Sequence, residues 1–115
     1  MKDVSGVIRY HDRDYKIVFN INVMEAIQDE YGTLDKWGEL TDGTQGEPNA
    51  KAIKYGFLQM INEGIEIDNE ANGTDFPLLT LKQVGRMITE YGLDNITKAM
   101  NNTVIESSKS EEKNS

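Results

Sequence analysis

The chain has 115 residues, a length typical of a single domain, with 37% hydrophobic and 28% charged residues. Its formal net charge of −8 disfavours general binding to nucleic-acid phosphates and to anionic membrane surfaces, because both depend on clusters of Lys and Arg. The same charge is ordinary for a soluble protein, and it also suits a basic partner or an imitation of nucleic acid. No cysteine is present, which excludes disulfides, thiolate zinc sites and a cysteine nucleophile.

The N-terminal residues 1–16 lack the apolar stretch of a secretory signal. No apolar run in the chain approaches the ~18 residues that a membrane-spanning helix needs. We therefore expect a cytoplasmic protein without a membrane segment.

The first predicted element is a β-hairpin. Apolar and aromatic residues in 7–10 precede a polar connection at 11–14, and more of them follow it. This pattern indicates two antiparallel strands, although no Asn-Gly or Asp-Gly pair fixes the turn type. Tyr15, Ile17 and Phe19 share one face of the second strand. An isolated hairpin is only marginally stable, so this face is expected to be covered by helices.

An amphipathic helix is predicted directly after the hairpin, with Tyr31 near its end. Asn20 or Asn22 can cap it, and Asn22 with Glu25 three residues later resembles a capping box. Gly32 is expected to end the helix, because glycine adopts the left-handed conformation after a last helical turn with little strain.

Hydrophobic periodicity predicts further helices after Gly32. They are a short helix at 34–40 capped by Thr33, a longer helix from about Pro48 or Asn49 to near Gly64, a helix that Thr80 caps and Gly92 ends, and a last helix at about 93–105. Residues 65–77 are acidic and interrupted by Asn72-Gly73, so we expect an exposed connection there, with a short hairpin as an alternative. The predicted fold is one α+β domain over residues 1–106, in which the hairpin packs against four or five helices. A disordered charged tail is expected over residues 107–115.

One acidic run resembles a calcium-binding loop. Residues 68–73 (DNEANG) match the opening of an EF-hand loop, with oxygen ligands at its first, third and fifth positions and glycine at its sixth. The twelfth position must supply a bidentate glutamate, and Leu79 stands there instead. The eighth position, usually apolar, is Asp75. We interpret the run as a solvated turn, with a weak, adventitious ion site as the alternative, and we expect no cofactor.

The other candidate residues favour structural roles. His11 is the single histidine, which excludes a His-based metal cluster, and its place at a hairpin tip favours an exposed turn residue over a general base. Asp12 and Asp14 do not fit acid–base catalysis, which needs two carboxylates in different environments. Trp37 and three of the four internal methionines lie on helical stripes, so core positions are favoured over a binding surface. No catalytic, cofactor-binding or metal residue is assigned, an enzyme is not expected, and the partner-binding residues stay undetermined.

A family resemblance adds a functional expectation. The segments that carry it are the hairpin GVIRYHDRDYKIVFNI, the helix NVMEAIQDEYG, the short helix TLDKW, the helix AIKYGFLQMINEG and the run LTLKQVGRMITEYGLDNITKAM. This order of parts resembles the tail assembly chaperones of long-tailed phages and the related gene-transfer-agent proteins. The resemblance covers roughly residues 5–104, and its motifs are patterns of apolar residues and glycine stops.

The resemblance implies a non-catalytic phage or prophage protein that acts in the host cell and is absent from the mature virion. Members of this family bind the tape-measure protein, keep its apolar helical segments soluble, and help recruit tail-tube subunits. Many are made in two forms through a programmed frameshift, and this chain, ending at Ser115, would then be the short form. Such a chaperone needs an exposed apolar groove or a self-associating surface, so a homo-oligomer is left open.

Two other classes of function stay open. A small structural protein of the tail or head, such as a connector, would be found in purified particles, whereas a chaperone would be absent. An acidic inhibitor that imitates DNA should display its carboxylates in rows on one face. The Asp and Glu residues of this chain are instead spread over predicted loops and helix surfaces.

Overall fold

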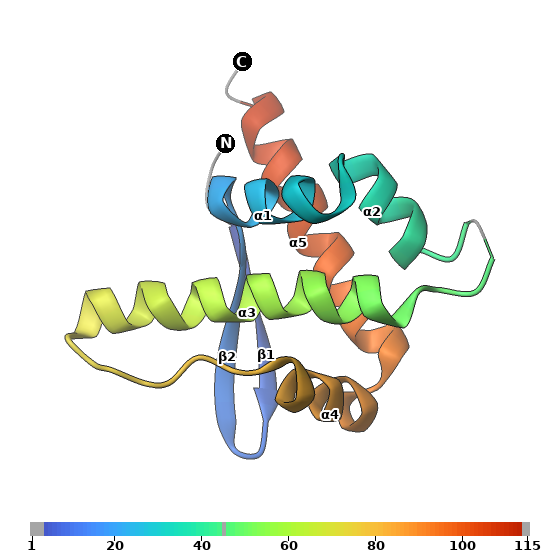
Figure 1. The fold of residues 1–115 in the computed structure, drawn as a ribbon. Helices are drawn as coiled ribbons and strands as arrows, with labels where there is room; N and C mark the ends of the chain where they lie inside the picture. Colours follow the sequence, from blue (N-terminus) through green and yellow to red (C-terminus); the bar gives the residue numbers. More distant parts are fainter. Residues whose placement is uncertain (1–3, 45, 114–115) are drawn as a thin grey trace.

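The computed structural model of the protein describes residues 4–44 and 46–113. Within them, a two-stranded antiparallel sheet is followed by helices, which confirms the mostly helical α+β class with an N-terminal hairpin. The elements in chain order are β1 (Val4–Tyr10), β2 (Arg13–Phe19), α1 (Ile21–Tyr31), α2 (Leu34–Thr41), α3 (Ala50–Asn72), α4 (Leu81–Tyr91) and α5 (Leu93–Lys113) (Figure 1).

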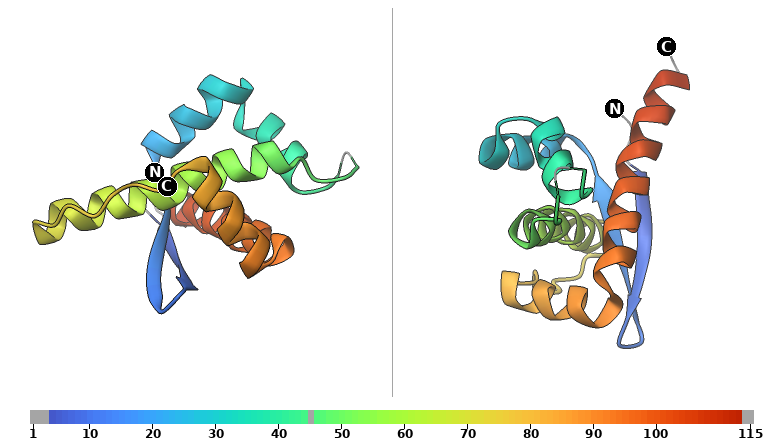
Figure 2. Two further views of the ribbon diagram at one scale, coloured as in Figure 1. Left: turned by 60° about the horizontal axis from the view of Figure 1, so that its bottom comes forward. Right: turned by 90° about the vertical axis from the view of Figure 1, so that its right-hand side faces the viewer.

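The elements form two layers. One layer holds α1 and α2, then α3, then α4, in that order across the molecule (Figure 1). The hairpin and α5 lie side by side in the second layer, as the side view in Figure 2 shows. Helix α3 contacts β2 of the second layer, α1 and α2 along one flank, and α4 along the other. The core therefore lies around α3.

The hairpin is closed by a tight turn. Its register runs from the pair Val4 and Phe19 to the pair Tyr10 and Arg13, which leaves a two-residue connection. Both connecting residues, His11 and Asp12, have positive φ angles, 49° and 63°. Positive φ at both central positions is the mark of a type I′ turn, whose twist matches that of antiparallel strands.

Asn20 is the residue that caps α1. Its side chain accepts a hydrogen bond from the backbone N–H of Val23 at 3.2 Å. The alternative cap at Asn22 is not formed, since Asn22 already lies inside the helix and its amide donates to Glu63 at 3.0 Å. Asn20 donates to the same Glu63 oxygen at 2.8 Å, so the start of α1 is fixed to α3 as well as capped.

The predicted end of α3 near Gly64 is wrong. The helix continues to Asn72 and ends at Gly73, which has a φ of 65°. The predicted connection at 65–77 is therefore helical over its first part. Gly64 marks a close crossing instead, because a Cβ atom there would lie 2.1 Å from the backbone oxygen of Lys16 in β2.

Two asparagines of α3 hold the connection that follows it. We call residues 74–80 the strap; they run beside α3 in Figure 1 without regular secondary structure. Asn69 donates to the carbonyl of Phe76 at 3.0 Å and accepts from its N–H at 3.1 Å. Asn62 makes the same pair of bonds with Leu79, at 3.0 and 2.8 Å. Each side-chain amide thus bonds both the N–H and the carbonyl of one strap residue, as a peptide group of a neighbouring strand would in a sheet.

Helix α5 is longer than predicted. It continues past the predicted end at Ile105 to Lys113, so the tail expected to be disordered is helical up to that residue. Thr103 and Ser107, one turn apart, are both buried, and their small polar side chains extend the packed side of the helix. Composition alone missed this because neither residue is apolar. Residues 114–115 lie outside the described residues.

The hydrophobic core joins both layers. Trp37 and three of the four internal methionines, Met60, Met87 and Met100, are buried, as predicted for core positions, and Met24 is half-buried. The other buried members of the core are Ile8, Ile17, Phe19, Val23, Ile27, Ala52, Ile53, Phe57, Ile61, Val84, Ile88 and Ile96. The indole of Trp37 lies over Gly56 of α3, where a Cβ atom would lie 2.3 Å from the ring carbon Cζ2.

We predict that Gly56→Ala destabilises the protein by about 2 kcal/mol, because the added methyl group must displace a buried indole. The matched control is Gly38→Ala in α2, where a Cβ would meet nothing within 4 Å. That variant should gain about 0.5–1 kcal/mol from the better helix propensity of alanine. Urea unfolding of both variants measures the difference, and shifts of the same sign would contradict the packing at Gly56.

Candidate functional site

The acidic residues singled out in the sequence form no shared site. The run at 68–73 belongs to the end of α3 rather than to a loop, and Asp68 accepts a hydrogen bond from Lys16 Nζ at 2.9 Å. Asp12 lies in the hairpin turn, and Asp14 is paired with Arg9 at 2.8 Å. Among the described residues, no group of three or more His, Asp or Glu side chains is arranged to hold a metal ion.

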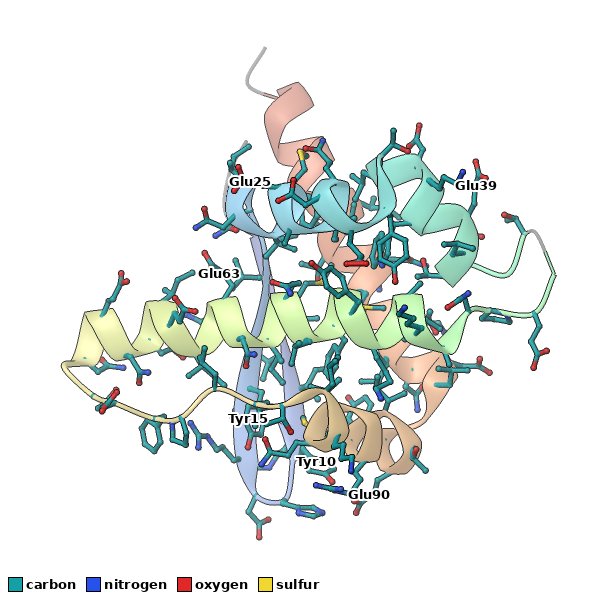
Figure 3. The ribbon with its side chains drawn as sticks, viewed as in Figure 1. Tyr10, Tyr15, Glu25, Glu39, Glu63 and Glu90 are labelled. Atoms are coloured by element: carbon teal, nitrogen blue, oxygen red, sulfur yellow. The ribbon has the colours of Figure 1, made fainter. Side chains whose placement is uncertain are left out.

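His11 takes part in a cluster that the sequence did not reveal. Its Nε2 lies 3.0 and 3.1 Å from the two carboxylate oxygens of Glu90, near the end of α4. The hydroxyl of Tyr10 donates to Glu90 Oε2 at 2.9 Å, and the rings of Tyr10 and His11 are stacked with centroids 4.0 Å apart. In Figure 3, Tyr10 and Glu90 lie together beside α4. The cluster fastens the tip of the hairpin to α4.

These contacts favour the ionised form of Glu90. Hydrogen bonds from His11 and Tyr10 hold the pKa of Glu90 below its usual value of 4.5. The same carboxylate raises the pKa of the Tyr10 hydroxyl, because it accepts that proton in a hydrogen bond. His11 and Glu90 are exposed to solvent, and Tyr10 is half-buried against the core.

A depression lined by apolar side chains lies between α2 and α5, and we call it the groove. It has a volume of ≈ 490 Å³. Its floor is formed by apolar side chains of both helices, namely Leu34, Trp37, Val104 and Ile105. Ile105 is 49% exposed, so its side chain is accessible from the groove. The groove therefore offers apolar surface to a partner.

The rim of this groove carries charge of one sign. Asp35, Glu39 and Asp42 all line it, and Glu39 can be found on α2 in Figure 3. The backbone N–H of Thr44 donates to Asp42 Oδ1 at 2.9 Å and, with the hydroxyl of Thr44, lowers the pKa of that carboxyl. The Asp42 side of the rim is thus negative at neutral pH and disfavours an acidic partner.

The wall formed by α2 is rigidly placed. Thr33 caps the helix by accepting the N–H of Lys36 at 3.0 Å, as predicted. Trp37 donates its Nε1–H to the carbonyl of Ala52 in α3 at 2.9 Å, which fixes the indole under the groove. A groove that is already formed needs little rearrangement to bind, so less affinity is lost to ordering.

This arrangement suits the binding of an amphipathic helix. An apolar groove of this kind accepts the apolar face of a helix, and its acidic rim favours Lys or Arg beside that face. In the sequence, Leu34 and Trp37 fall at helical spacing within 34–40, and Val104 falls on the apolar side of 93–105. No local pattern links these two apolar stripes, because they lie far apart in the chain.

Comparison of the chain with protein-family models, with curated proteins and with solved structures found no match. None of the helices in the described part of the chain has the length and apolar character needed to cross a membrane. The surfaces of the structure and the resemblance in the sequence therefore carry the functional inference.

We predict that Glu90→Gln destabilises the protein at pH 7 and that the loss disappears in acid. The folded-state pKa of Glu90 is lowered, so its contribution is present above the unfolded pKa of 4.5 and is lost as pH falls through the folded pKa. Urea unfolding at pH 7 and at about pH 3 measures this change.

The control for this prediction is Glu25→Gln. Glu25 is exposed on α1, and its side chain has no hydrogen-bond partner among the residues that the structure describes. Its substitution should leave the stability difference between the two pH values as it is in the wild type. A Glu90→Gln deficit of equal size at both pH values would contradict the role of the ionised carboxylate.

Proposed function

We propose that this protein is a phage tail assembly chaperone that binds the tape-measure protein in the groove between α2 and α5. The observation that carries the proposal is the exposed apolar floor of this groove beneath a rim of carboxylates. A protein that keeps long apolar helices soluble needs an exposed apolar surface and enough charge to stay dissolved itself. The groove and the net charge of −8 supply both.

In the proposed complex, a helical segment of the tape-measure protein lays its apolar face on Leu34, Val104 and Ile105. Basic side chains next to that face lie within reach of the carboxylates of Asp35 and Glu39. The contact is largely apolar, and the charges set its orientation and exclude acidic segments. A long tape-measure protein offers many such segments, so several copies of the chaperone would bind along it.

The rest of the proposal follows the family resemblance. The chaperone acts in the cytoplasm of the host cell, has no catalytic role and needs no cofactor. It helps recruit tail-tube subunits, and it leaves before the virion is complete. Self-association of bound copies is compatible with this role, because neighbouring copies on one helix would be held close together.

The test is co-expression of the tagged chain with the tape-measure protein and the tail-tube protein of the same phage genome. We expect the tape-measure protein to be soluble only when the chain is present, and to co-purify with it. The variant Ile105→Glu should lower the co-purified amount at least about tenfold, because it places a charge on the apolar floor and costs more than ~1.4 kcal/mol of binding.

The matched control is Ile21→Glu. Ile21 is the same residue type, is 61% exposed and lies on α1, away from the groove. It should leave co-purification at the wild-type amount. Equal loss in both variants, or a tape-measure protein that is equally soluble without the chain, would contradict the proposal. Presence of the chain in purified particles would favour a structural protein of the tail instead.

A further inference from the structure

A second depression lies on the opposite flank of α3, between α3 and α4. It has a volume of ≈ 640 Å³. Three cations line it, Lys54 from α3 and Lys82 and Arg86 from α4. The chain holds only 12 Lys and Arg against 20 Asp and Glu, so a surface where three cations gather departs from the character of the whole molecule. We call this surface the basic cleft.

The three cations have no ion-pair partner within the described part of the chain. The one carboxylate that lines the cleft, Glu90, is held by Tyr10 and His11. Lys82 also lies in the first turn of α4, where the helix dipole disfavours positive charge, and no acidic residue offsets it there. The unfavourable position of Lys82 at the start of α4 is therefore not offset within the fold, and a partner with negative charge would offset it.

The floor of the cleft is shallow. Gly85 lies under the end of Lys54, whose Cε and Nζ atoms would be 3.3 and 3.4 Å from a Cβ at that position. Leu81 lies one helical turn before Gly85 and is 47% exposed, and Thr89 lies one turn after it. The surface of α4 that faces a partner therefore starts with the apolar side chain of Leu81. It continues over the small residues Gly85 and Thr89, with cations on both sides.

We propose that the basic cleft binds an acidic amphipathic helix of a partner protein. Leucine-type side chains of that helix would contact Leu81, and its carboxylates would pair with Lys82 and Arg86 on one side and Lys54 on the other. Lys82 and Arg86 are one turn apart, about 6 Å along the axis, which matches carboxylates spaced four residues apart on a second helix.

A protein helix fits this surface better than nucleic acid does. A long polyanion would extend beyond three cations and meet the negative field of a chain with net charge −8. The apolar side chain of Leu81 would also make no favourable contact with a phosphate backbone. This proposal does not depend on the tape-measure complex, which uses the other flank of α3 and a partner of opposite charge.

The test uses the full chain labelled with ¹⁵N and a synthetic helical peptide of about 18 residues, or five turns, with glutamates four residues apart and leucines beside them. We expect amide shifts confined to the residues of the basic cleft and of the α4 start. Added salt should weaken the binding, because it screens the charge pairs. The double variant Lys82→Glu/Arg86→Glu should bind at least about tenfold more weakly.

Two further variants separate binding from folding. Gly85→Leu keeps every charge and displaces only the flexible end of Lys54, so a folded Gly85→Leu protein that no longer binds the peptide supports the cleft as the site. Lys36→Glu/Lys98→Glu changes the net charge equally at exposed positions outside the cleft, and it should bind as the wild type does. Circular dichroism verifies the helical content of each variant.

Three outcomes would overturn the proposal. One is wild-type affinity in the double variant Lys82→Glu/Arg86→Glu. Another is an equal response to a peptide in which lysine replaces every glutamate. The third is tighter binding of inorganic phosphate or of a short single-stranded oligonucleotide at the same amides, which would assign the cleft to phosphate groups instead.

Discussion

The structure depends on the close packing of neighbouring elements against two glycines of α3. At Gly56 the indole of Trp37 occupies the space of a side chain, and at Gly64 the backbone of β2 does. The two glycines lie eight residues apart, about 12 Å along the helix, so one helix receives both an aromatic ring and a strand. This close packing lets a chain of modest apolar content bury a continuous core around a single helix.

The position of α3 also separates two surfaces of opposite charge. The acidic groove lies beyond α2 on one flank, and the basic cleft lies against α4 on the other. Both are walled by helices whose first turns are capped, by Thr33 in α2 and by Thr80 with Gln83 in α4. The two proposed partners would therefore bind to separate surfaces and would not compete for one site.

Local signals in the sequence predicted much of the fold, and long-range contacts account for what they missed. The caps at Thr33 and Thr80 and the glycines that end α1 and α4 depend on neighbouring residues, so the sequence predicted them. Gly64 was mistaken for a helix end, because a sequence does not distinguish a glycine that ends a helix from one that a crossing strand requires. Tyr10 and Glu90 are 80 residues apart, and no local pattern links them. The walls of the groove are separated in the same way, which is why only its separate stripes were predicted.

The hydrogen bonds that hold the strap limit the insertions and deletions that the fold tolerates. Asn62 and Asn69 are seven residues apart on α3, a rise of about 10.5 Å, and the residues they bind, Phe76 and Leu79, are three residues apart in extended chain, about 10 Å. The two spacings agree only for this count. Inserting or deleting a residue between Phe76 and Leu79 would leave one asparagine unpaired. Length variation among related chains is therefore not expected between these two residues.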